Sequence, residues 1–323
     1  MENIKSKNNE QSKLRAFFSG DQFKAMLPFI GLILIVVVMN ILTGGKLLTP
    51  KRMRLLLSQV YYPAIVATGV FFIMTLGSID FTEGSTLGVA SIVISMLSFK
   101  SIPLAILGGI LTGAAIGAVN GFFHVKFKLP SFIVTICTMY LFRGVCAYMT
   151  TETAVPASKA IKALDLDWLK ITITVAVLLI AWILFQFTRI GNDVKAVGSG
   201  ETAARFSGVR TDLVKFLVFV CAGALTGLAA FVNVIKVGSI TSTAGNQLET
   251  QILISLVLGG LPITGGAKVR FSNIVVGTLM YTVLNNGLVM MGYDSAMQQL
   301  IKGVIFLIFV ALTIDRKALK VIK

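Results

Sequence analysis

The sequence is poor in charged residues, which make up only 13% of its 323 residues. A soluble domain of this length carries roughly twice that fraction. Hydrophobic residues make up 55% of the chain, and several apolar runs reach the ~20 residues that a bilayer-spanning helix needs. The shortage of charge therefore excludes an ordinary soluble domain and predicts an all-α polytopic membrane protein.

Residues that carry catalytic or metal chemistry are also scarce. The single histidine, His124, stands beside Lys126 at the end of an apolar segment, which favours an interfacial residue over a ligand. The three cysteines, Cys137, Cys146 and Cys221, all fall inside apolar segments and are interpreted as small core residues rather than a disulfide set. No cluster of histidine, cysteine and carboxylate has metal-ligand spacing. We expect no cofactor in this chain.

An internal energy source is missing as well. The phosphate-binding motif G-x-x-x-x-G-K-[ST] does not occur, which excludes ATP hydrolysis by that route. Ion-coupled carriers usually place ionisable groups in the middle of the membrane, but the acidic residues Asp80, Glu83, Glu249 and Asp294 lie at segment ends. Of the ionisable residues, only Arg143 lies well inside a segment. The sequence indicates a transport pathway, not an enzyme, and points to an external motor.

Ten hydrophobic segments are predicted to form a single transmembrane domain over residues 26–315, between cytoplasmic tails over residues 1–25 and 316–323. They are Met26–Leu42, Leu55–Leu76, Leu87–Phe99, Ile102–Phe123, Ser131–Met149, Trp168–Phe187, Leu213–Ile235, Leu248–Gly260, Ser272–Met291 and Gln298–Ile314. Ten crossings would put both ends of the chain on one side of the membrane.

The distribution of positive charge sets the predicted orientation. The net charge of +15 sits in tails and connections, which does not suggest binding to nucleic acid. With the N-terminus inside, cytoplasmic parts hold 18 of the 29 lysines and arginines and the outer loops hold 9. This bias predicts that both termini are cytoplasmic. Lys46, Lys51, Arg52 and Arg54 fall on the outside, where an amphipathic stretch along the interface would tolerate them.

An internal repeat is visible at a constant offset of 161 residues. Gly77–Leu87 and Gly238–Leu248 share six of eleven residues. Each copy follows a long apolar segment and precedes a short one of 13 residues, about 20 Å of helix, which is too short to span. The two copies lie in halves at about 55–150 and 213–315. Since the first half would start outside and the second inside, the repeat is inverted. Chance similarity between small-residue turns is the alternative.

Paired short segments in two halves of a membrane protein point to a transport pathway. Unpaired backbone groups in such turns must face protein or water, and asparagines offer donors and acceptors that suit hydroxyl-rich solutes. For Asn286, a structural helix-to-helix hydrogen bond is the alternative. The predicted pathway residues are Asp80, Thr82, Gly84, Asn120, Thr243, Gly245, Asn285 and Asn286.

The longest structured-looking polar interruption is the stretch 189–212, between two apolar segments. Ser199 is expected to cap a two-turn helix and Gly208 to close it. Two turns are too short to be stable in water unaided, so the helix must pack on its own membrane domain or on a partner. A basic cytoplasmic loop is the alternative. The residues of interest are Gly198, Ser199, Glu201, Ala203, Ala204, Arg205, Phe206 and Gly208.

Several blocks resemble, in order and over nearly the whole chain, the permease subunits of bacterial binding-protein-dependent ABC importers of the ribose/galactose type. The blocks are GSIDFTEGS at 77–85, LPSFIVTICTMYLFRG at 129–144, AVGSGETAARFSGV at 196–209, LETQILISLVLGGLPITGG at 248–266, VLNNGL at 283–288 and QQLIKG at 298–303. Two departures stand out: Glu83 adds a carboxylate to the first block, and the family's usual asparagine is missing at Gly200-Glu201.

The resemblance implies a multi-pass subunit of the bacterial plasma membrane that moves a small hydroxylated solute, most simply a monosaccharide. It implies three partners: a cytoplasmic ABC ATPase that binds ATP, an extracytoplasmic solute-binding protein, and a second permease copy or homologue. The stretch 189–212 would then contact the ATPase. A nucleoside or autoinducer-type solute is the alternative within the family. An ion-coupled secondary transporter is the alternative from another class.

Overall fold

The computed structural model describes residues 21–313. The predicted tails lie outside these residues, except that 21–25 belong to the first described helix. The elements are α2 (Asp21–Leu42), α3 (Pro50–Ser58), α4 (Tyr61–Thr75), α5 (Glu83–Leu97), α6 (Ile102–Lys126), α7 (Ser131–Met149), β1 (Val155–Pro156), α8 (Lys159–Lys162), α9 (Asp167–Phe187), α10 (Arg189–Ser199), α11 (Glu201–Phe206), α12 (Thr211–Val237), β2 (Ser239–Ile240), α13 (Leu248–Leu258), α14 (Ser272–Met290) and α15 (Ser295–Thr313).

The predicted hydrophobic segments are helical, one of them as two helices, and local chemistry sets several of the ends. Ser101 caps α6 by accepting a hydrogen bond from the Leu104 backbone nitrogen at 3.2 Å. α7 begins directly after Pro130. α12 ends at Gly238, whose φ of 73° is left-handed and therefore suits glycine. The polytopic helical class follows from these apolar helices.

Membrane-spanning length is reached by only part of the set. Among the described residues, α6, α7, α9, α12 and α14 are long and apolar enough to cross a membrane. The pair α3 and α4, bent by 43°, adds a sixth if it counts as one span. The apolar parts of α2, α5, α13 and α15 are shorter. Ten crossings therefore remain a prediction.

The segment predicted as Leu55–Leu76 is not one helix, and this expectation is corrected. The chain bends between Ser58 and Tyr61, and the charged residues before the bend belong to a separate helix, α3. That helix exposes its lysine and two arginines and buries Leu56, which is the amphipathic arrangement expected for this cluster. A second correction concerns the cysteines: Cys146 is buried, but Cys137 and Cys221 are exposed on the surface of the chain.

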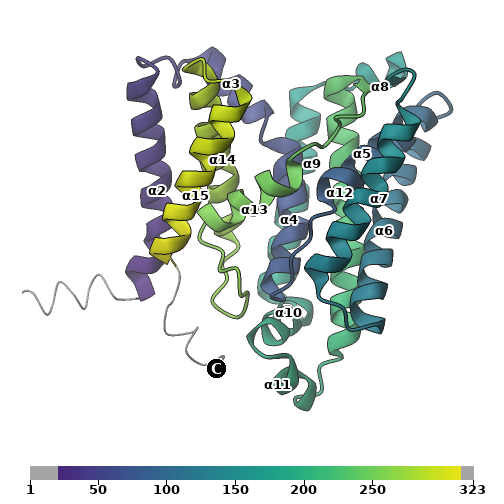
Figure 1. The fold of residues 1–323 in the computed structure, drawn as a ribbon, viewed down its shortest axis with the longest axis vertical. Coiled ribbons are helices and arrows are strands. Elements are labelled where there is room, and N and C mark those ends of the chain that lie inside the picture. The colour runs from purple at the N-terminus through teal and green to yellow at the C-terminus, as the bar shows by residue number, and fades with distance from the viewer. Residues whose placement is uncertain (1–20, 314–323) are drawn as a thin grey trace, which may run out of the picture.

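The helices form two groups that lie side by side (Figure 1). In one group α12 packs against α4, α5 and α6. In the other, α14 packs against α2 and α13, with α15 beside them. α12 and α6 approach closely because a Cβ on Gly113 would overlap the carbonyl oxygen of Gly223, and the reverse is also true. The core is built from buried side chains of both groups, with Phe71, Ile92 and Ile252 among them.

The two ends of the molecule differ. α10 and α11 project at one end, where α2 also begins and α15 ends; we call this the α11 end (Figure 1). The opposite end carries α3 and α8. β1 pairs there in antiparallel register with β2, Val155 opposite Ile240, so the connection after α7 is tied to the turn that follows α12.

Candidate functional site

The two turns identified by the sequence repeat meet in the structure. Gly84 lies in the first turn of α5, and Gly245 precedes α13 with a φ of 69°. A Cβ on Gly84 would overlap the carbonyl oxygen of Gly245, and a Cβ on Gly245 would overlap the carbonyl oxygen of Gly84. Residues at the same place in the two copies are therefore in reciprocal backbone contact, which only glycine permits.

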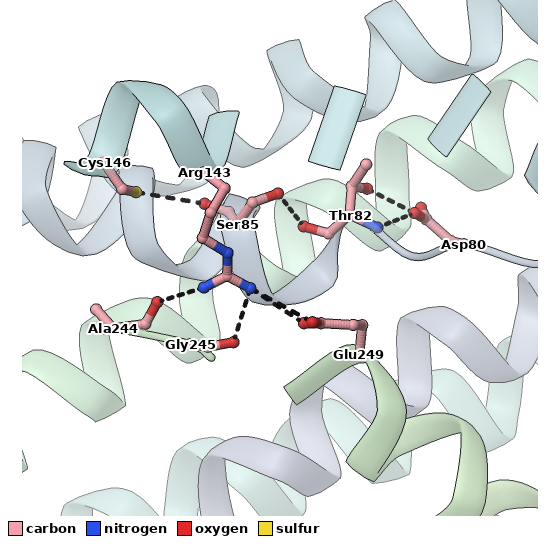
Figure 2. A network of polar contacts seen from close by, with 8 residues as sticks. All are labelled: Asp80, Thr82, Ser85, Arg143, Cys146, Ala244, Gly245 and Glu249. Carbon is pink, nitrogen blue, oxygen red and sulfur yellow. Dashed lines mark hydrogen bonds and ion pairs between the residues drawn. The ribbon is translucent and has the colours of Figure 1, made fainter. Parts of the chain in front are cut away.

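Arg143 of α7 holds the second turn from the side (Figure 2). Its Nη1 donates to the carbonyl oxygen of Ala244 at 3.1 Å, and its Nη2 donates to that of Gly245 at 3.4 Å. The same Nη2 lies 3.4 Å from both carboxylate oxygens of Glu249, the second residue of α13. Both side chains are largely buried, at 23% and 12% exposure. One guanidinium thus ties α7 to the start of α13.

A chain of buried polar side chains leads away from the first turn. Asp80 accepts hydrogen bonds from the Thr82 backbone nitrogen at 2.7 Å and from its hydroxyl at 2.5 Å. Asn120 of α6 donates to the Thr82 hydroxyl oxygen at 2.9 Å. Thr138 of α7 donates to Asn120 Oδ1 at 2.7 Å. Figure 2 shows Asp80 and Thr82 beside Ser85, whose hydroxyl donates to the Thr82 carbonyl oxygen. Three helices are joined through these groups.

Glu83 stands next to this chain and is the carboxylate that departs from the family's block. Its side chain is 2% exposed. Oε2 accepts a hydrogen bond from the hydroxyl of Thr226 in α12, whereas Oε1 has no hydrogen-bond partner among residues 21–313. A buried carboxyl group with an unused oxygen is costly, so a hydrogen-bond donor brought to Oε1 would stabilise Glu83.

Two other predicted pathway residues lie elsewhere. Asn286 Nδ2 donates to Gln59 Oε1 at 2.9 Å and so joins α14 to the bend between α3 and α4. Asn285 Oδ1 accepts from Lys302 Nζ of α15 at 3.0 Å. Lys302 also lies 3.3 Å from the Tyr281 hydroxyl. Asn285 connects helices within the α14 group, Asn286 joins α14 to the bend before α4, and neither is bonded to the chain around Asn120.

Thr243, in the second turn, has a different setting from Thr82. Its side chain is exposed, and its hydroxyl lies 2.9 Å from that of Thr241. The predicted pathway residues therefore form one connected group, from Asp80 to Asn120 with the Gly84–Gly245 contact, and a separate pair on α14, while Thr243 belongs to neither.

The stretch 189–212 contains two helices rather than one. Ser199 is the last residue of α10 and does not cap α11, so the expected cap is wrong; Gly200 precedes α11 and has no side chain to offer. Because α10 extends to Ser199, its hydroxyl donates to the Lys195 carbonyl oxygen at 2.8 Å. The Ser199 hydroxyl oxygen also accepts a hydrogen bond from the Ala267 backbone nitrogen at 3.0 Å. Ser199 therefore links α10 to the connection between α13 and α14.

α11 is held at its base and exposed at its tip. Glu201 accepts from Lys215 Nζ at 2.5 Å and pairs with Arg205 at 3.4 Å. The hydrogen bond from Lys215 is the main reason that the pKa of Glu201 lies below its usual range. Phe206 is 89% exposed, and Gly208 follows with the expected left-handed φ of 86°.

Of the two alanines of α11, Ala204 is buried and Ala203 is exposed. α10 rests on the membrane domain through its own end. A Cβ on Gly198 would overlap the carbonyl oxygen of Thr75, the last residue of α4. The same oxygen accepts a hydrogen bond from the Gly266 backbone nitrogen at 3.0 Å. The end of α4, the end of α10 and the connection before α14 are thus in direct contact.

Residues 53–310, most of the chain, match the family described as branched-chain amino acid transport system / permease component. The chain belongs to this permease family. It is 30% identical to the ribose import permease protein RbsC of Bacillus subtilis (strain 168), over 97% of this chain and 99% of that protein. It is 29% identical to RbsC of Escherichia coli (strain K12), over 94% and 97%. The D-allose transport system permease protein AlsC of the same strain is 27% identical, over 97% of each. No solved structure gives a significant match to the chain.

Membership confirms the resemblance read from the sequence blocks: this is a permease subunit of the ABC importer type, a transport subunit embedded in the membrane. Within residues 21–313, no group of three or more histidine, cysteine or acidic side chains is placed to hold a metal ion. The site consists of hydrogen-bonding side chains, the backbone contact of Gly84 with Gly245 and the guanidinium of Arg143. Such groups suit the binding of a solute and its passage through the permease.

Sequence reasoning about this permease missed the partner of Arg143 and the bonds of Lys302. Arg143 was visible as a single charge well inside an apolar segment, a pattern that marks functional or paired residues in membranes, and Lys302 as a charge near the start of one. Their partners lie 106 residues away in the case of Glu249 and 17 in the case of Asn285. Nothing in the local sequence identifies them.

Proposed function

We propose that this permease forms the translocation pathway of an ABC importer for a monosaccharide, with Gly84 and Gly245 at its constriction. The observation that carries this proposal is the reciprocal contact of these two glycines, each in a turn that begins a short helix. Short paired helices whose ends lie inside the protein are typical of transport pathways. The names of the relatives, ribose and D-allose permeases, favour a sugar as the solute.

The two turns belong to halves related as an inverted repeat. The support is that equivalent positions of the two copies touch each other, as they would next to a two-fold axis. α4 and α5 precede and follow the first turn, and α12 and α13 precede and follow the second. Opening the pathway then requires the two turns to separate, which breaks or shifts the hydrogen bonds that Arg143 makes to the second turn.

A hydroxyl-rich solute fits the groups beside the constriction. Thr82, Asn120 and Thr138 exchange hydrogen bonds with one another in the present state. Hydroxyls and amides act as donor and acceptor at once, so these groups can exchange bonds among themselves for bonds to a sugar. Glu83 adds an acceptor with an unused oxygen. Asn285 and Asn286 lie apart from these groups, bonded to Lys302 and to Gln59.

Motion is supplied by a separate cytoplasmic ATPase that binds the ATP. Phe206, at the exposed tip of α11, is the side chain that inserts into a groove of the ATPase. The contacts of Gly198 with Thr75 and of Ser199 with Ala267 carry the movement of α10 to the end of α4 and to the connection before α14. The exposed pair of Arg205 and Asp212 contributes only ~0–1 kcal/mol.

The remaining partners follow from the two ends of the molecule. α2 begins and α15 ends at the α11 end (Figure 1), which favours cytoplasmic N- and C-termini. The solute-binding protein then docks at the opposite end, where α3 and the paired strands lie. A second permease copy or homologue completes the pathway with its own pair of turns.

Uptake of radiolabelled sugars by proteoliposomes that contain the permease, its ATPase and its binding protein tests this function. We expect ATP-dependent uptake of a pentose or hexose and none of a nucleoside. Uptake without the ATPase that is abolished by a protonophore would instead establish an ion-coupled carrier. ATP-dependent uptake of a nucleoside or autoinducer-type solute alone would keep the ABC permease but contradict the monosaccharide.

A further inference from the structure

A groove opens at the α11 end, where α9 passes into α10 and the connection leads into α14. Its volume is about 550 Å³. Trp182, Gln186 and Phe187 of α9 form one wall, Lys195 stands on α10, and Arg270 and Ser272 close the other side. The groove is separate from the constriction and from the exposed tip of α11. Nothing in the proposed transport cycle uses it.

The groove is positively charged and has free donors. Lys195 Nζ donates one hydrogen bond, to the Phe185 carbonyl oxygen at 3.1 Å, and lies 4.1 Å from the Phe185 ring centroid. An ammonium group has three donors, so two make no hydrogen bond within the described part of the chain. The Arg270 side chain is exposed, and within residues 21–313 no carboxylate forms an ion pair with it or with Lys195. Two cations thus face the same space.

The apolar wall of the groove continues the surface of a membrane-spanning helix. Among residues 21–313, α9 is one of five helices long and apolar enough to cross a membrane, and most of its length is not covered by the other described residues. Trp182 and Phe187 are 43% and 67% exposed and pack edge to face, with ring centroids 5.1 Å apart. Aromatic side chains near the end of a spanning helix sit at the level of the lipid headgroups.

We propose that this groove binds the headgroup of an anionic phospholipid. The lipid phosphate lies between Lys195 and Arg270, and the first part of an acyl chain lies along Trp182 and Phe187. Basic pockets between helices at a membrane surface select anionic headgroups by charge. A soluble anion would use the two cations but not the aromatic wall, and the wall is what assigns the site to a lipid.

The bound lipid would also join the two segments that we assign to coupling. Lys195 lies on α10 and Arg270 on the connection before α14, and these segments already touch through the Ser199 hydroxyl and the Ala267 backbone nitrogen. A phosphate shared by both cations strengthens that contact. Binding itself does not depend on the proposed transport function, so it is tested without transport.

The chain has only two tryptophans, and both lie on α9. Trp168 lies about 21 Å of helix away from Trp182, near the opposite end. In a Trp168→Phe protein, fluorescence therefore reports on the groove alone. The full chain is reconstituted into phosphatidylcholine vesicles with a small fraction of phosphatidylglycerol or phosphatidylcholine that carries bromine atoms near the headgroup end of its acyl chains. We expect brominated phosphatidylglycerol to quench Trp182 more strongly than the same fraction of brominated phosphatidylcholine.

Matched variants separate the groove from general attraction to a basic protein. Arg270→Gln and Lys195→Gln should each lower the preference for phosphatidylglycerol about fivefold. Lys268→Gln, exposed on the same connection and outside the groove, should leave it unchanged. In a Trp182→Phe protein, Trp168 should show no preference. Because the Arg270 side chain makes no hydrogen bond within residues 21–313, Arg270→Gln is expected to fold even if Lys195→Gln does not.

Three results would overturn the proposal. Equal quenching of Trp182 by the two brominated lipids would show that the groove does not select an anionic headgroup. An unchanged preference in Arg270→Gln would show that the basic side chains are not the ligands. Loss of the preference on adding millimolar inorganic phosphate, at constant ionic strength, would show that the groove binds a soluble anion.

Discussion

The backbones of Gly84 and Gly245 pack directly against each other. A Cβ added to either glycine would overlap the carbonyl oxygen of the other. The two residues are separated by the same 161 positions that relate the two copies of the sequence repeat. Their contact joins the start of α5 to the turn before α13, and Arg143 holds that turn from α7. The consequences of changing these residues follow from how closely the backbones approach.

Gly84→Ala or Gly245→Ala should impair both folding and uptake. A methyl group has no room at either position, and overpacking costs about 1–3 kcal/mol. We expect a lower melting temperature of the purified permease and a loss of uptake that exceeds the loss of folded protein. Gly144→Ala on α7 is the matched control, since nothing lies within 4 Å of its added Cβ. Normal uptake by the Gly245→Ala protein would show that the turns are not the constriction.

Arg143→Lys should weaken the hold on the second turn. A lysine keeps the charge but lacks the planar fork of two nitrogens, of which Nη1 reaches the Ala244 carbonyl oxygen and Nη2 the Glu249 carboxylate. Removing one partner of a fully buried ion pair costs about 3–5 kcal/mol, and the partial exposure of Arg143 places the cost of Arg143→Gln below that range. A double-mutant cycle with Glu249→Gln measures the pair directly. Additive effects on unfolding free energy would show that the two side chains act independently.

Asn286→Leu distinguishes the two roles left open by the sequence. Its hydrogen bond to Gln59 favours the structural role, with a contribution of ~0.6–2 kcal/mol in a membrane. If this role is correct, Asn286→Leu and Gln59→Leu each lower the melting temperature by a similar amount, and the double variant lowers it no further. Uptake per assembled complex is then retained. Reduced uptake per assembled complex, at unchanged stability, would instead place Asn286 in the pathway. Asn120→Leu, beside the constriction, should reduce uptake in either case.

Phe206→Ala should reduce the co-purification of the ATPase. The ring is 89% exposed, so its removal costs the isolated permease little stability. Tyr148→Ala is the matched control, because this aromatic side chain is 84% exposed at the end of α7. We expect ATPase binding and uptake to fall together in the first variant and to stay normal in the second. The reverse pattern would remove α11 from the coupling surface.

Acidification should loosen the base of α11. The hydrogen bond from Lys215 lowers the pKa of Glu201, so the pair stabilises the folded state above the unfolded pKa of about 4.3. That contribution is lost as the pH falls through the folded pKa. Since Glu201 is partly exposed, the effect is small, about 0–1 kcal/mol. The melting temperatures of the wild-type permease and of the Glu201→Gln variant should become equal below the folded pKa of Glu201. A difference that stays constant with pH would show that the pair of Glu201 and Lys215 does not stabilise the fold.

The apolar segments and the equivalence of the two turns could be predicted from the sequence alone. Segment Ser131–Met149 is a helix with the predicted bounds, because Pro130 and a polar turn delimit a run that is apolar apart from Arg143 and a few small polar residues. The left-handed Gly208 was also predictable, since glycine after a short helix commonly takes that conformation. Local chemistry is sufficient for features of this kind.

Ser199 shows where local reasoning fails. A serine before an acidic turn resembles an N-cap, but the preceding residues continue as α10, and the serine hydroxyl bonds to Lys195 and Ala267 instead. α10 exists because Gly198 packs against Thr75 and Val194 is buried among α4 and α12. Those contacts come from residues far away in the chain and carry no local signal.

The sequence by itself determined that this protein is a helical membrane permease with two related turns, because hydrophobic length, charge distribution and motif order are properties of the chain. Only the tertiary structure decided that Gly84 faces Gly245, that Arg143 binds Glu249, and that the asparagines of α14 lie apart from Asn120. The physical reason is that hydrogen bonds and close packing depend on distances between segments a hundred or more residues apart. Periodicity along one segment does not set those distances.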